Sequence, residues 1–130
     1  MVIENHPRLP EGSPFPTLFW LTCPILVKRV STLEGDGAMA GLNAELERDA
    51  AFVTRVDGDI ARYARRRDAL ARLDDPGVPG GGPDRVKCLH AHVAHELADP
   101  PSSVGARALA RTGWPDCVIP CIPPATTETP

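Results

Sequence analysis

Fifteen prolines in a chain of 130 residues restrict where regular structure can form. A proline ring cannot continue a helix, and it removes a hydrogen-bond donor from a strand, so a cluster of prolines ends a regular element. The prolines gather in four segments, 7–24, 76–83, 100–101 and 115–130. Long regular elements are therefore expected between these segments.

The first 23 residues predict a two-stranded β-hairpin. Strands are expected at 2–9 and 17–22, because the PEGSP segment between them consists of turn-forming residues. Bulky and β-branched residues at 17–21 favour a strand, and Pro24 ends it. A strand edge that is left unpaired can pair with another chain, so we expect a homodimer through the edge of this hairpin.

The next part of the sequence predicts helices. A first helix is expected over 25–33, and a GDG turn follows it. From 38 to 73, apolar residues recur every three or four positions, with a break expected near Asp49 or Gly58. This spacing is typical of amphipathic helices that pack on a core.

Two further helices are expected after a glycine-rich loop at 74–84. Asp84 is a suitable N-cap for a helix over 84–99, which two prolines end, and a serine caps a short last helix. The sequence therefore predicts an α+β, mainly helical fold, with an N-terminal β-hairpin packed on about four helices. A single domain is expected over 1–124, with a disordered tail at 125–130.

Charge and hydropathy argue against two classes of partner. The net charge of −3 gives no case for nucleic acid, whose protein partners are usually strongly basic. The most apolar stretch, 15–27, contains two prolines and is shorter than the roughly 20 apolar residues of a membrane span. The sequence does not open on a secretory signal, so a cytoplasmic location is expected. In a reducing compartment, four cysteines indicate metal or redox chemistry more than disulfides.

The segment 84–99 concentrates the residues most suited to chemistry. It holds three of the four histidines and one of the four cysteines. On a helix, Cys88, His92 and His95 share one stripe, whereas His90 falls among the apolar positions. Because thiolates and imidazoles are preferred zinc ligands, this stripe indicates a zinc site.

Other cysteines can complete such a site. Cys117 and Cys121 are spaced like a loose ligand pair, and Cys88 with His92 forms a second pair one helical turn apart. Cys23 can replace a member of either pair. Two alternatives stay open: Cys23 and Cys88 can be small buried core residues, or Cys88 can be a nucleophile with His92 as its base.

A basic patch supports a different function. Arg65 and Arg66 belong to the segment ARYARRRDALAR, and Arg85 and Lys87 follow the glycine-rich loop. Guanidinium groups bind phosphate oxygens through paired donors. The alternative hypothesis is therefore an enzyme or binding protein that acts on a phosphorylated or polyphosphate-like anion. Neighbouring aspartates offer a plainer interpretation, a solvated helix face with spaced ion pairs.

Three blocks occur in order along the chain: PRLPEGSPFPTLFWLTCP (7–24), PDRVKCLHAHVAHELA (83–98) and VGARALARTGWPDCVIPC (104–121). Together they resemble the DUF501 family, a group of uncharacterised bacterial, mainly actinobacterial, proteins. The family pattern maps onto Phe15, Pro16, Thr17, Cys23, Pro24, Cys88, His90, His95, Gly105, Cys117 and Cys121. The resemblance favours Cys88, His90 and His95 as a shared set, because His92 departs from the pattern.

These observations lead to one main hypothesis. The protein is expected to be a cytoplasmic accessory protein of unknown role, with a Cys/His cluster that binds a structural zinc ion. The expected metal ligands are Cys23, Cys88, Cys117 and Cys121, followed by His90 and His95.

Overall fold

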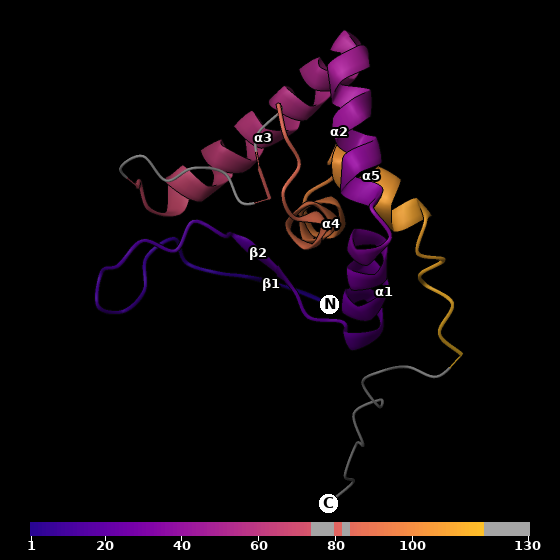
Figure 1. The fold of residues 1–130 in the computed structure, drawn as a ribbon. Coiled ribbons are helices and arrows are strands. Elements are labelled where there is room, and N and C mark those ends of the chain that lie inside the picture. Colours follow the sequence, from indigo (N-terminus) through magenta and orange to yellow (C-terminus); the bar gives the residue numbers. More distant parts are fainter. Residues whose placement is uncertain (74–79, 82–83, 119–130) are drawn as a thin grey trace, which may run out of the picture.

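A computed structural model describes residues 1–73, 80–81 and 84–118. A two-stranded sheet is followed by five helices (Figure 1). The elements are β1 (Val2–Glu4), β2 (Phe19–Leu21), α1 (Pro24–Gly35), α2 (Ala38–Arg48), α3 (Ala50–Leu70), α4 (Leu89–Ala98) and α5 (Ser103–Ala110). The α+β, mainly helical fold with an N-terminal hairpin is confirmed. The expected tail at 125–130 lies outside the described residues.

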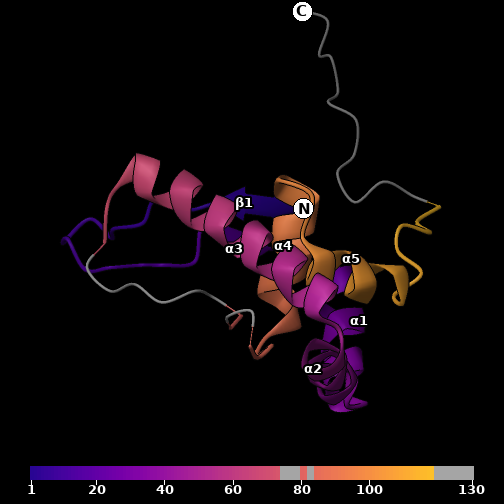
Figure 2. The ribbon, with the colours of Figure 1, turned by 90° about the horizontal axis from the view of Figure 1, so that it is seen from above.

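Helix α4 lies at the centre of the molecule. In Figure 1 it is seen end-on, with the hairpin on one side and α1, α3 and α5 around the rest of it. The view from above in Figure 2 also places α4 between the hairpin and α5. Its residues Leu89, Val93 and Ala94 are fully buried. The helix that carries three of the four histidines is thus also the central helix of the core.

The hairpin is antiparallel but shorter than expected. Its register pairs Val2 with Leu21, Ile3 with Trp20 and Glu4 with Phe19. The prediction of strands over 2–9 and 17–22 was wrong in extent, because the prolines between them cannot donate to a ladder. No third strand among the described residues covers either edge, and the expected homodimer stays a prediction.

The helical region of 38–73 breaks at one of the two expected positions. Asp49 ends α2 and also caps α3, since its carboxylate accepts a hydrogen bond from the Phe52 N–H at 3.1 Å. Gly58 continues inside α3. The last helix begins as expected at a serine cap, because Ser102 Oγ accepts from the Gly105 N–H at 3.2 Å.

The start of the α4 segment differs from the prediction. The helix begins at Leu89 and not at Asp84, because the backbone before it is bonded elsewhere. Asn43 in α2 accepts from the Val86 N–H at 2.7 Å and donates to the Val86 carbonyl at 3.2 Å, as a neighbouring strand would. The Lys87 N–H donates to the Gly80 carbonyl at 2.7 Å. These bonds keep residues 86–88 out of the helix, and Cys88, whose backbone is extended, is the N-cap residue of α4.

Helices α4 and α5 pack with their backbones in close contact. A Cβ placed on Gly105 would lie 2.0 Å from the His92 carbonyl oxygen, so only glycine fits there. None of the described helices is both long and apolar enough to cross a membrane.

Candidate metal site

Three side chains with metal-binding atoms meet where α1 ends and α4 begins. Glu34 comes from the last turn of α1, Cys88 precedes α4, and His90 lies in the first turn of α4. Cys88 Sγ is 3.9 Å from His90 Nδ1, which is 3.1 Å from Glu34 Oε1. The three ligand atoms lie within 4.8 Å of one another, and no other group of histidine, cysteine, aspartate or glutamate among the described residues does so.

Glu34 is held in this position by the backbone of α4. Its Oε1 accepts from the Leu89 N–H at 2.8 Å. The Cys88 side chain makes no capping hydrogen bond, so Glu34 takes over the role of an N-cap side chain from outside the helix. One carboxylate oxygen therefore ties α1 to the end of α4 that carries Cys88 and His90.

The hydrogen bonds of His90 show that its Nε2 atom carries a proton. Nε2 lies 3.2 Å from the Val27 carbonyl oxygen and 3.0 Å from Ser31 Oγ. The Ser31 hydroxyl donates its only proton to the same carbonyl at 2.9 Å, so the proton between His90 and these two oxygens belongs to Nε2. In a neutral ring Nδ1 is then an unprotonated acceptor or metal ligand, whereas in a protonated ring it donates to the Glu34 carboxylate at 3.1 Å.

Nδ1, a carboxylate oxygen and a sulfur are all atoms that bind metal ions, and a shared cation can hold them together. Ordinary zinc–ligand lengths in a tetrahedron separate S and N by about 3.6 Å and N and O by about 3.3 Å. The observed 3.9 Å and 3.1 Å lie within 0.3 Å of those values. The Nε2–H bond to a backbone carbonyl is the arrangement that orients a histidine ligand in zinc sites. The three side chains therefore form a group that can hold a metal ion.

An apolar cavity of about 470 Å³ adjoins this group. It lies between β2, α1 and the beginning of α4, and its wall includes Trp20, Leu21, Val27, Cys88, His90 and Ala91. Two of the three candidate ligands thus face an accessible space. A metal held by three protein ligands keeps a fourth position for water or another molecule.

The remaining expected zinc ligands lie elsewhere. Cys23 is buried in the core before α1, and Cys117 is exposed; both are free thiols. Cys121 lies outside the described residues. His92 Nε2 donates to the Gly80 carbonyl at 3.0 Å, and burial lowers the pKa of His92. The predicted stripe of Cys88, His92 and His95 does not form, because Cys88 precedes the helix.

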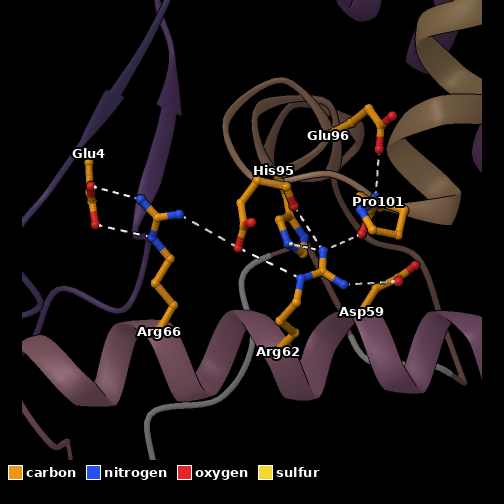
Figure 3. A network of polar contacts seen from close by, with 9 residues as sticks. Glu4, Asp59, Arg62, Arg66, His95, Glu96 and Pro101 are labelled. Atoms are coloured by element: carbon orange, nitrogen blue, oxygen red, sulfur yellow. Dashed lines mark hydrogen bonds and ion pairs between the residues drawn. The ribbon is translucent and has the colours of Figure 1, made fainter.

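His95 belongs to a different cluster (Figure 3). Its ring packs on Phe19 and Tyr63, and Arg62 Nη2 lies 3.2 Å from its Nε2. The same guanidinium bonds the Asp99 carbonyl at 2.8 Å and the Pro101 carbonyl, and it lies 3.5 Å from the Asp59 carboxylate. Because arginine only donates, His95 Nε2 accepts and the imidazole is neutral. Burial, followed by the charge of Arg62, lowers the pKa of His95 to about 4.

This depressed pKa makes stability depend on pH. The unfolded chain protonates His95 near pH 6.5, but the folded protein does so only near pH 4, so the free energy of unfolding falls as pH drops through that range. We expect the protonation of His95 to lower the free energy of unfolding by about 2 to 3 kcal/mol over this pH range. Urea unfolding of wild type and His95→Gln, which keeps an acceptor for Arg62, measures it. A variant with the same pH slope as wild type would contradict this assignment.

The four residues of the expected anion site differ in their surroundings. Arg65, Arg85 and Lys87 are exposed. Arg66 is paired with Glu4 at 3.2 Å, its guanidinium lies 5.0 Å from the centre of the Phe19 ring, and its pKa is raised chiefly by the bond to Glu4. Anion binding by these four residues stays a prediction.

Sequence reasoning missed Glu34. It sits in the segment STLEGDG, 54 positions before Cys88, and no ligand spacing points to it. The one available signal was the expected end of the first helix near residue 33, which leaves a carboxylate at the helix terminus. Only the packing of α1 against α4 shows which groups that carboxylate meets.

The chain matches the family of proteins of unknown function DUF501 over residues 1–110. It therefore belongs to that family, as the three sequence blocks indicated. No curated protein and no solved structure matches the chain. Cys88 and His90, which the family resemblance singled out, are two of the three residues that the structure brings together.

Proposed function

We propose that this protein binds zinc through Glu34, Cys88 and His90, with an open fourth position beside the apolar cavity. One observation carries the proposal: a carboxylate oxygen of Glu34, the sulfur of Cys88 and a ring nitrogen of His90 lie within 4.8 Å of one another. A zinc ion satisfies all three groups at once.

The open position distinguishes this proposal from a purely structural zinc site. Structural zinc is usually closed by four protein ligands, whereas sites that bind or transform small molecules retain an exchangeable one. The proposal keeps Cys88 and His90 from the expected Cys/His cluster and replaces the more distant cysteines with Glu34. It supports an accessory protein whose metal is accessible from the cavity.

Two substitutions of Glu34 test the ligand set. Glu34→Gln keeps an oxygen that accepts from the Leu89 N–H, but it removes the carboxylate charge from the metal site. Calorimetric titration with zinc should show an affinity at least about 10-fold weaker than wild type, while the melting temperature without metal stays close to wild type.

The matched variant Glu34→Ala removes both the ligand and the cap. It should weaken zinc binding as much as Glu34→Gln and also lower the free energy of unfolding without metal by about 1 kcal/mol. Wild-type zinc affinity in both variants would contradict a role for Glu34 in metal binding.

A further inference from the structure

The cavity beside the zinc site has the size and the lining of a small-molecule site. Its volume of about 470 Å³ falls within the roughly 300–1,000 Å³ of ligand pockets, which combine apolar walls with a few polar groups. Three elements contribute to its wall, with Trp20 and Leu21 from β2, Val27 from α1 and Ala91 from α4, and Gly80 adds to it from the loop before α4. The polar groups at its wall include Cys88 and His90.

The charges at the site indicate which head group it accepts. A zinc ion with the thiolate of Cys88, the carboxylate of Glu34 and a neutral His90 has no net charge. Such a centre offers a coordination position without a strong attraction for phosphate or other multiply charged anions. A neutral or weakly acidic oxygen donor suits it better.

The indole of Trp20 indicates where the body of a ligand rests. Its side chain is 53 % exposed although it lines the cavity, whereas the neighbouring Leu21 is 6 % exposed. A large aromatic ring that is half in water at a cavity wall provides apolar area for a bound molecule to cover.

We propose that the cavity binds a small molecule with an apolar body, whose oxygen-donor head takes the fourth position on the zinc. This inference rests on the proposed zinc site. The body lies between Trp20, Val27 and Ala91, and the head lies against Cys88 and His90.

Octanohydroxamic acid is the probe for this inference, because it joins an eight-carbon chain to a metal-binding oxygen head. The chain contains two tryptophans, so Trp114→Phe leaves Trp20 as the reporter. With zinc bound, the Trp20 fluorescence should respond to the probe and saturate at one probe per chain. The zinc-bound protein should bind the probe at least about 10-fold more tightly than the zinc-free protein does. It should also bind the probe at least about 10-fold more tightly than octanamide, which has the same chain length. Calorimetry on the wild-type protein gives the same comparison without the tryptophan substitution.

Ala91→Leu provides the cavity control. The larger side chain fills part of the cavity and should weaken probe binding at least about 10-fold, with zinc affinity unchanged because Ala91 is not one of the three candidate ligands. Normal zinc binding without probe binding would overturn this inference and leave the zinc proposal intact, and a zinc-dependent dimer that buries Trp20 would do the same. Equal affinity for octanamide would overturn the placement of the head on the metal. Failure to bind zinc would overturn both proposals.

Discussion

Replacing Cys88 with serine is expected to weaken zinc binding by at least about 100-fold. A serine hydroxyl stays protonated near neutral pH and is a poor zinc ligand, whereas a thiolate is one of the best. The fold should survive, because Cys88 makes no capping hydrogen bond and the Glu34 carboxylate still caps α4. Competition with a chromophoric zinc chelator measures the affinity over this wide range.

The control for Cys88→Ser is Cys117→Ser. Cys117 is exposed and lies outside the group of three candidate ligands, so the same atom exchange should leave zinc affinity unchanged. Circular dichroism verifies that both variants are folded. If Cys117→Ser reduced zinc affinity as strongly as Cys88→Ser, the metal would lie at a different set of cysteines.

Replacing Gly105 with alanine is expected to cause the largest loss of stability among the glycine substitutions in helices. The added Cβ would lie 2.0 Å from the His92 carbonyl oxygen and 3.0 Å from the Glu96 Cβ. Both obstacles belong to α4, and the nearer one is backbone, so α4 and α5 must move apart. We expect the free energy of unfolding to fall by about 3 kcal/mol, measured by urea denaturation.

Gly58→Ala is the matched control for this substitution. Gly58 lies inside α3, and a Cβ there would have no atom within 4 Å. Alanine should therefore stabilise the protein by about 0.5 to 1 kcal/mol through helix propensity alone. The same glycine-to-alanine substitution is thus expected to lower the free energy of unfolding in α5 and to raise it in α3. A stabilising effect of Gly105→Ala would contradict the close packing of α4 on α5.

Local sequence signals predicted most of the fold. The helix break at Asp49 and the serine cap of the last helix occur as expected, and in both cases a side chain bonds the backbone a few residues away. The hairpin was predicted from its turn residues and bulky strand residues. Its length was overestimated, since the prolines limit pairing more than the pattern of side chains suggests.

The candidate site was predicted only in part, because it depends on contacts distant in the sequence. Asn43 bonds Val86 and delays the start of α4, and this turned the expected helical pair of Cys88 and His92 into a pair of Cys88 and His90. Glu34 joins them from another helix. Helical periodicity contains no information about either contact.

The absorption spectrum of the cobalt-substituted protein tests the zinc site most directly. Cobalt(II) replaces zinc in tetrahedral sites, and a bound thiolate adds a sulfur-to-metal charge-transfer band in the near ultraviolet. We predict one cobalt per chain, visible bands of a four-coordinate centre, and a charge-transfer band that disappears in Cys88→Ser but persists in Cys117→Ser. A spectrum of octahedral cobalt without the sulfur band would contradict a metal site at Glu34, Cys88 and His90.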